Sequence, residues 1–278
     1  MDLFAVLTAS KGVPDDVVAQ VASSLEGTSN RLSQRAVEIR FDGEPLTFAI
    51  DGIDLNFIPA EAREKHLLIA DMDSTIITVE CIDELADFAG KKDAVSDITE
   101  RAMRGELDFE EALHARVGML KGVSRDDIQS CFESRVSLTP GATELVAEMN
   151  NRGMTALVSG GFTVFTEKVA AETGFQFTHA NTLLFDGDVL SGEVGQPIVH
   201  SGTKLDVLTR LLGEQGLGFE HAIAVGDGAN DAPMVQAAGL GVAFHAKPAL
   251  KKVADAVLDH SDLTALLALQ GIKSPFVL

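Results

Sequence analysis

Residues 66–75 read HLLIADMDST, an apolar run that ends abruptly in two acidic residues. The run has the length of a buried strand, and Asp71 and Asp73 follow it directly. In open α/β sheets, ligands bind just outside the carboxyl ends of the strands. Two carboxylates spaced by two residues at such a place can share the work of a nucleophile and an acid/base. The stretch therefore predicts a strand with a catalytic pair at its end.

Three more apolar runs follow along the chain, at residues 154–158, 222–225 and 240–244. Amphipathic stretches separate them, and this alternation is typical of βαβ units and a parallel sheet. We therefore expect an α/β fold with a Rossmann-like parallel sheet and helices on both faces, formed by residues 65–77 and 140–278.

Residues 78–139, between the first two runs, favour helices. Phe109, Leu113, Val117 and Leu120 recur at spacings of three and four, and the turn signal Thr139-Pro140-Gly141 closes the segment. We expect a helical cap inserted after the first strand, with helices at residues 82–89, 94–104, 109–120 and 126–135.

Two other segments depart from this pattern. Residues 182–199 alternate around Phe185-Asp186-Gly187-Asp188-Val189, which predicts a β-hairpin and makes its two aspartates turn residues. Residues 1–64 are expected to form a small α+β domain, with strands at residues 3–7, 35–41 and 45–50 and a helix at residues 15–25.

The composition excludes several classes of protein. A formal net charge of −20 argues against a nucleic-acid partner, which needs a basic face. Cys81 and Cys131 are too few for a disulfide framework or a zinc site. No run reaches the roughly 18 apolar residues of a membrane span, and the N-terminus lacks the pattern of a secretory signal. We expect a cytoplasmic protein without a membrane partner.

Three further motifs lie at or near predicted strand ends. Ser159-Gly160-Gly161 offers a hydroxyl and unobstructed backbone N–H groups to a phosphoryl oxygen. Lys204 lies at the start of a predicted helix, where an ammonium adds to the positive field that favours a phosphate. The hexapeptide GDGAND at residues 226–231 combines turn glycines with carboxylates that suit a hard cation.

Taken in order, these motifs resemble the signature of the haloacid dehalogenase-like phosphohydrolases: D-x-D, Ser/Thr, Lys, then G-D-x-x-x-D. Within that superfamily, Glu80 in VECIDE, the segment MRGELDF at residues 103–109 and Arg116 are similar to the phosphoserine phosphatase family. The resemblance covers about residues 65–265. It implies an enzyme that hydrolyses the small molecule phosphoserine, the last step of serine biosynthesis.

The resemblance also implies roles for the core residues. Asp71 would be the nucleophile that forms an aspartyl phosphate, and Asp73 the acid/base. Mg²⁺ would be held by the Asp71 carboxylate, the Asp73 backbone carbonyl and Asp227, with Asp231 orienting this shell. The phosphoryl oxygens would be bound by Ser159, Gly160, Lys204 and Asn230.

The same resemblance gives the cap residues the choice of substrate. Glu80 would bind the ammonium of serine and Arg116 its carboxylate, while Met103 and Phe109 would shield the pocket. Taken alone, Arg116 is equally consistent with a surface ion pair to Glu110 or Glu111. Met103 and Phe109 are also consistent with packing inside the cap.

Several alternatives stay open at this point. The substrate could be another small phosphate monoester, the enzyme could transfer the phosphoryl group to another alcohol, or the chain could be a non-catalytic serine sensor. Residues 1–64 are similar in outline to ACT-type amino-acid-sensing domains (βαββαβ), but are about one helix and one strand too short. Such a shortened domain would serve to form a homodimer or to pack on the core.

Overall fold

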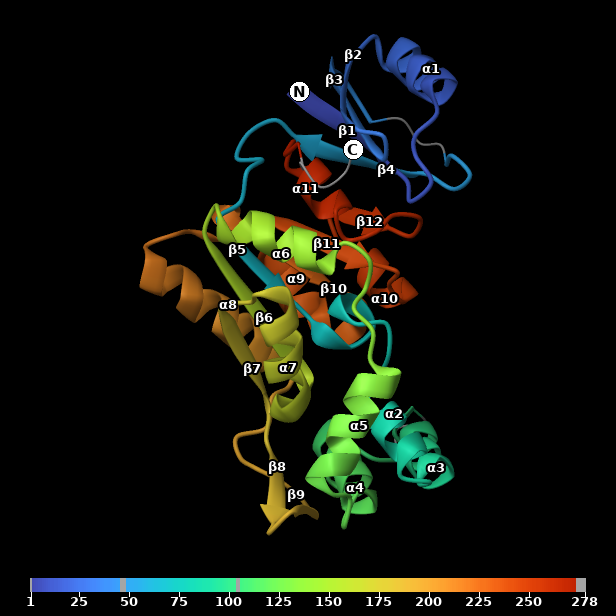
Figure 1. The fold of residues 1–278 in the computed structure, drawn as a ribbon. Coiled ribbons are helices and arrows are strands. Elements are labelled where there is room, and N and C mark those ends of the chain that lie inside the picture. Colours follow the sequence, from blue (N-terminus) through green and yellow to red (C-terminus); the bar gives the residue numbers. More distant parts are fainter. Residues whose placement is uncertain (1, 46–48, 104–105, 274–278) are drawn as a thin grey trace.

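The computed structural model describes residues 2–45, 49–103 and 106–273, without the side chains of residues 102 and 103. Its main sheet consists of β5 (Leu67–Ala70), β6 (Met154–Phe162), β7 (Phe177–Asn181), β10 (Ala222–Gly226), β11 (Leu240–Phe244) and β12 (Ala256–Leu258). All pairs are parallel, in the order β12-β11-β10-β5-β6-β7 (Figure 1). The four predicted strands and the α/β class are confirmed.

Successive strands of this sheet are added first on one side of β5 and then on the other. From β5 the chain continues to β6 and β7 on one side, and then returns to β10, β11 and β12 on the other. The end of β5 is therefore the topological switch point of the sheet, where open α/β folds bind their ligands. Asp71 is the first residue beyond that end.

Helices cover both faces of the sheet, as expected. Alternate side chains of a strand point to opposite faces. Leu68 and Ala70 accordingly join the apolar cluster with α6 (Ala142–Asn150) and α7 (Thr163–Thr173). Leu67 and Ile69 join the cluster with α8 (Ser201–Gln215), α9 (Ala232–Ala237) and α10 (Pro248–Lys251). This two-sided burial explains the continuous apolar run of β5.

The inserted segment forms the predicted helices, with bounds shifted by one or two residues: α2 (Cys81–Phe88), α3 (Lys92–Met103), α4 (Phe109–Met119) and α5 (Arg125–Arg135). Capping boxes start two of them, since Asp108 pairs with Glu111 and Ser124 with Asp127. In Figure 1 these helices gather at the end of the molecule opposite the N-terminal sheet. Residue 104, the expected end of the second helix, lies outside the described residues.

Two connections hold the cap to the core. In the linkers, the Thr78 N–H donates to the Ser137 carbonyl at 3.0 Å and the Thr139 N–H to Ile76 at 2.9 Å. The predicted hairpin, β8 (Leu183–Asp186) and β9 (Val189–Val194), is confirmed and reaches the cap from the side. The Leu190 N–H donates to the Val123 carbonyl at 2.8 Å.

The N-terminal residues form a four-stranded antiparallel sheet in the order β2-β3-β1-β4. Its elements are β1 (Asp2–Thr8), α1 (Asp15–Leu25), β2 (Thr28–Ser33), β3 (Ala36–Asp42) and β4 (Asp54–Pro59). The strand predicted at residues 45–50 is wrong where it can be judged: Pro45 and Ala49 lie outside strands, and residues 46–48 are not described. The last strand is β4 instead.

Burial on β4 explains that error. Its buried residues include Asp54 and Asn56, while Leu55 and Phe57 are only partly buried. The Asn56 side chain pairs with the backbone of Val257 in β12 at 2.8 and 3.0 Å. The face of β4 that carries Asp54 and Asn56 thus packs on the main sheet, while Leu55 and Phe57 pack against the core of the N-terminal sheet, so polar residues occupy buried positions of this strand. Figure 1 places α11 (Ala265–Leu269) and β12, the edge strand of the main sheet, next to the N-terminal sheet.

Across the described residues, no helix is both long and apolar enough to cross a membrane.

Candidate active site

A pocket that is partly open to solvent lies between the cap and the carboxyl ends of β5, β6 and β10. It brings together most of the predicted site residues, namely Asp71, Asp73, Glu80, Phe109, Arg116, Ser159, Gly160, Asp227 and Asn230. Lys204 and Asp231 are buried next to it and contact its floor. Met103 ends α3, but its side chain lies outside the described residues.

Lys204 lies between two carboxylates. Its Nζ is 2.7 Å from Asp71 Oδ1 and 2.6 Å from Asp231 Oδ1, and its side chain is 1% exposed. Burial acts to lower the pKa of Lys204, but the two carboxylates outweigh it and hold that pKa above its ordinary value. A buried charge is tolerated only when it is paired in this way. Lys204 therefore keeps a fixed positive charge beside Asp71.

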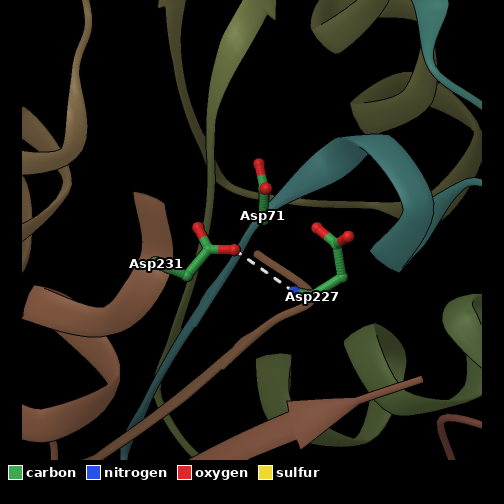
Figure 2. A group of neighbouring side chains, drawn as sticks. All are labelled: Asp71, Asp227 and Asp231. Atoms are coloured by element: carbon green, nitrogen blue, oxygen red, sulfur yellow. Dashed lines mark hydrogen bonds between the residues drawn. The ribbon is translucent and has the colours of Figure 1, made fainter. Parts of the chain in front are cut away.

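Asp71, Asp227 and Asp231 form an acidic triad, with one oxygen from each lying within 4.8 Å of the others (Figure 2). Asp231 is already engaged by protein donors: Oδ1 by Lys204, and Oδ2 by the Asp227 and Gly228 N–H groups at 3.2 and 3.1 Å. Burial raises the pKa of both Asp227 and Asp231.

The two recorded partners of Asp71, the Met72 N–H and Lys204, both contact Oδ1. Among the described residues, Asp71 Oδ2 has no partner, and the Asp227 carboxylate has only a loose side-chain contact, with Lys247 Nζ 3.6 Å from its Oδ2, so both can accept a cation or a substrate. Carboxylate oxygens are the ligands that hard divalent cations take. The donor set therefore fits a divalent cation held by Asp71 and Asp227, with Asp231 as their support.

Asp73 lies in the tight turn after Asp71, where the next residue, Ser74, has a φ of 54°. The Cys81 N–H donates to Asp73 Oδ1 at 3.1 Å. Burial, with the nearby charges of Glu80 and Asp71, raises the pKa of Asp73 to about 8. A carboxyl group with such a pKa can hold a proton near neutral pH and release it, as an acid/base must.

The Ser159-Gly160-Gly161 motif lies in the irregular end of β6, not after it as predicted. Pairing with β7 shifts register between Val158 and Phe162, which frees these residues from the regular ladder. The Gly161 N–H donates to Ser159 Oγ at 2.8 Å. A Cβ on Gly161 would lie 2.8 Å from Asp73 Oδ2, so only glycine allows this approach.

The cap contributes a carboxylate, a guanidinium and an aromatic ring to the pocket. Ser74 Oγ donates to Glu80 Oε1 at 2.7 Å. Arg116 is half-buried; its Nε donates weakly to the Ala112 carbonyl at 3.4 Å, and it forms no ion pair with any described residue. The alternative of a surface ion pair to Glu110 or Glu111 is therefore not found. Phe109 is 46% exposed, and its ring lies 4.0 Å from where a Cβ on Gly160 would be.

Desolvation lowers the pKa of Arg116, while Asp83 and Glu80 oppose that effect. A guanidinium this short of partners, facing a pocket, is suited to a carboxylate ligand.

Sequence reasoning missed two functional candidates. Asn181, at the end of β7, is 1% exposed; it donates to the Gly160 carbonyl at 2.7 Å and accepts from the Val199 N–H at 2.8 Å, fixing the glycine motif. In the sequence, Asn181 is marked only as a polar residue at the end of a strand. That strand, at the edge of the sheet, was not predicted. Lys247 follows the end of β11 and lines the pocket. Its signal in the sequence is a basic residue three positions after the end of the fourth predicted strand.

The haloacid dehalogenase-like hydrolase profile matches residues 66–239. The chain is 43% identical over 217 residues to the phosphoserine phosphatase of Albidiferax ferrireducens. The matched region covers 76% of this chain and 92% of the relative. It is 41% identical over 228 residues to that of Archaeoglobus fulgidus, over 81% of this chain but only 66% of the relative.

Two solved structures extend the likeness to the N-terminal sheet. A hydrolase of the haloacid dehalogenase family from Salmonella enterica superposes with a TM-score of 0.86 at 27% identity, over 96% of this chain and 98% of its own. A probable phosphoserine phosphatase from Vibrio cholerae superposes with a TM-score of 0.83 at 30% identity, over 98% and 87%. The chain belongs to the haloacid dehalogenase-like hydrolases.

Proposed function

We propose that the chain is a phosphoserine phosphatase, which hydrolyses O-phospho-L-serine to L-serine and phosphate through an aspartyl phosphate on Asp71. One observation carries the proposal most directly: a single pocket joins the carboxylate pair Asp71 and Asp73 to a cap carboxylate, Glu80, and to the guanidinium of Arg116, which has no ion pair with the residues that the structure describes. Relatives that bear the name phosphoserine phosphatase support it.

In the first step, an Asp71 oxygen attacks phosphorus in line, and the bond from phosphorus to the serine oxygen breaks. Asp73 donates a proton to that leaving oxygen. In the second step, a water molecule attacks the phosphorus of the aspartyl phosphate, Asp73 takes the proton of that water, and Asp71 is released as a carboxylate. Asp73 thus serves as acid and then as base.

Phosphoryl transfer depends mainly on position and charge. Ser159, Gly160 and Asn230 line the pocket and would donate to the phosphoryl oxygens, while Lys204, 2.7 Å from Asp71 Oδ1, would hold Asp71 in place and add positive charge. Asp71, Asp227 and the backbone carbonyl of Asp73 are the residues that would hold Mg²⁺. The ion, when bound, would neutralise the charge of the phosphoryl group.

Recognition of serine rests on its opposite charges. Arg116 is suited to bind the carboxylate of phosphoserine with two parallel hydrogen bonds, and Glu80 to bind its ammonium. Phe109 covers the glycine motif from the cap side and would exclude water, a role we also give to Met103.

We also propose that the chain performs the last step of serine biosynthesis and does so in the cytoplasm. We also propose that residues 65–77 with 140–278 are the catalytic core, residues 78–139 the cap, and residues 1–64 a third unit, open to a role in a homodimer.

A panel of phosphate monoesters tests the proposal, with and without Mg²⁺. Phosphate should be released fastest from phosphoserine, well ahead of phosphothreonine, sugar phosphates and p-nitrophenyl phosphate, and only with the divalent ion. A preference for another monoester, transfer of phosphate to an added alcohol in place of water, or serine binding without turnover would each contradict it.

A further inference from the structure

Lys247 is held at the mouth of the pocket by its own backbone. It is the N-cap residue of α10, and its N–H donates to the Asp227 carbonyl at 2.8 Å. His245, two residues before Lys247, has a φ of 45°, which turns the chain sharply after β11. The next residue, Pro248, starts the helix with a fixed φ. Lys247 is therefore placed beside Asp227 whatever its side chain contacts.

The side chain of Lys247 is weakly held. Its Nζ lies 3.6 Å from Asp227 Oδ2, and the side chain is 68% exposed, whereas that of Asp227 is 11% exposed. An exposed ion pair at this distance contributes only about 0–1 kcal/mol. The ammonium can therefore exchange Asp227 for another anion at little cost.

The charges around the pocket leave Lys247 a specific task. The described residues that line the pocket include the carboxylates Asp71, Asp73, Glu80 and Asp227, and the cations Arg116 and Lys247. Arg116 belongs to the cap, and the buried Lys204 is already paired with two carboxylates. Among these lining residues, Lys247 is thus the cation on the core side that an incoming phosphate can recruit.

We propose that Lys247 is a substrate-binding residue that pairs with Asp227 in the metal-free pocket and with the phosphate of the substrate once a divalent cation neutralises Asp227. This inference rests on the proposed function for the nature of its anion. It makes two linked predictions with opposite signs. Removing the ammonium should strengthen cation binding, because a competitor for Asp227 is gone, and should weaken substrate binding.

The test compares Lys247→Met, Lys247→Arg and the control Lys251→Met. Lys251 lies on the same short helix, but pairs with Asp259 at 2.6 Å, outside the pocket. Isothermal titration of the substrate-free protein with Mg²⁺ or Mn²⁺ should show a Kd about two- to fivefold lower in Lys247→Met, the range expected of an exposed pair. Lys247→Arg and Lys251→Met should match the wild type.

Steady-state kinetics at saturating Mg²⁺ supply the second readout. The KM of Lys247→Met should rise roughly tenfold, typical of a charge-assisted hydrogen bond, with kcat less affected. The rise should occur for p-nitrophenyl phosphate as well as phosphoserine, because the phosphate is common to both. Since Lys247 is exposed, circular dichroism should report an intact fold.

Unchanged cation affinity or unchanged KM in Lys247→Met would overturn the inference, as would equal effects in Lys251→Met. Its failure is distinct from failure of the proposed function. If the wild type does not hydrolyse phosphoserine, the proposed function fails. The cation titration and the kinetics on p-nitrophenyl phosphate still decide the role of Lys247.

Discussion

Within the group formed by Asp71, Lys204 and Asp231, a single ammonium offsets the negative charge of two carboxylates. With a net charge of −20 and several carboxylates around one pocket, repulsion would favour protonated side chains. The buried ammonium of Lys204 lies within 2.7 Å of both Asp71 and Asp231 and opposes that tendency. It contacts Oδ1 of Asp71, which leaves Oδ2 without a partner among the described residues. Lys204 therefore ties the proposed nucleophile to its acidic neighbour Asp231.

We predict that Arg116→Ala lowers kcat/KM for phosphoserine by about 10- to 150-fold, the loss expected for a hydrogen bond to a charged group. Hydrolysis of p-nitrophenyl phosphate should be largely kept, since that substrate has no carboxylate. The exposed His114, on the same helix, gives a matched control in His114→Ala. An equal loss on both substrates would refute Arg116 as the residue that selects serine.

Gly161→Ala should abolish most turnover without unfolding the protein. The new Cβ would lie 2.8 Å from Asp73 Oδ2 and 3.0 Å from Ser159 Oγ, so both groups must move. A displacement of about 1 Å can cost about 100-fold in rate. Gly213→Ala serves as control, because a Cβ there meets nothing within 4 Å. The measurement is kcat on phosphoserine, and wild-type kcat in Gly161→Ala would contradict the geometry.

At the scale of elements, the cap is carried by its linkers and by the β8–β9 hairpin, which reaches it from the core. The Leu190 N–H and the Gly122 N–H each donate across this contact, at 2.8 and 2.9 Å. The guanidinium of Arg125 also lies over the Phe185 ring, 3.6 Å from its centre. Because Phe109 and Arg116 lie on α4, the hairpin helps to set how the cap presents them.

Alanine substitutions at two glycines of the hairpin distinguish the effect of its contact with the cap from the effect of backbone strain. Both Gly187 and Gly192 have positive φ, at 62° and 85°, but a Cβ at Gly192 would lie 3.0 Å from Lys121 in the cap, whereas one at Gly187 meets nothing within 4 Å. Gly192→Ala should therefore raise the KM for phosphoserine several-fold more than Gly187→Ala does. Equal KM values in the two variants would show that the hairpin does not position the cap.

The elements also show what the sequence could predict. The strand ends at Asp71 and Asp227 were found because buried parallel strands read as apolar runs that stop at polar residues. Asn181 was missed because β7 is a half-exposed edge strand without such a run. The strand β4 was misplaced because its buried residues include Asp54 and Asn56, whose partners lie about 200 residues away. Contacts of that range leave no local pattern.

At the scale of the whole molecule, the N-terminal sheet and the main sheet are joined by polar contacts. Asp54 accepts from the Asp259 N–H at 2.8 Å and from Ser261 Oγ at 2.6 Å. Arg63 pairs with Glu38 at 2.6 Å and donates to the carbonyls of Ala268 and Leu269. Among the described residues, the N-terminal unit is thus fixed to the last strand and helix of the core.

Asp54→Asn tests the strength of this joint. The amide would place N–H donors against backbone N–H groups, and an unsatisfied buried hydrogen bond costs about 1–3 kcal/mol. We expect a lower thermal midpoint of unfolding by calorimetry. The nearby Asp51 is exposed, so Asp51→Asn should leave the midpoint unchanged. Identical midpoints for both variants would mean that the contact adds nothing to stability.

The central claim of the account is that Asp71 accepts the phosphoryl group. It is tested most directly by rapid acid quench of the Mg²⁺-loaded enzyme during turnover of phosphate-labelled phosphoserine, followed by mapping of the labelled peptide. We predict transient label on Asp71 alone, and no label in Asp71→Asn. Label on another residue, or turnover in Asp71→Asn at the wild-type rate, would contradict the account.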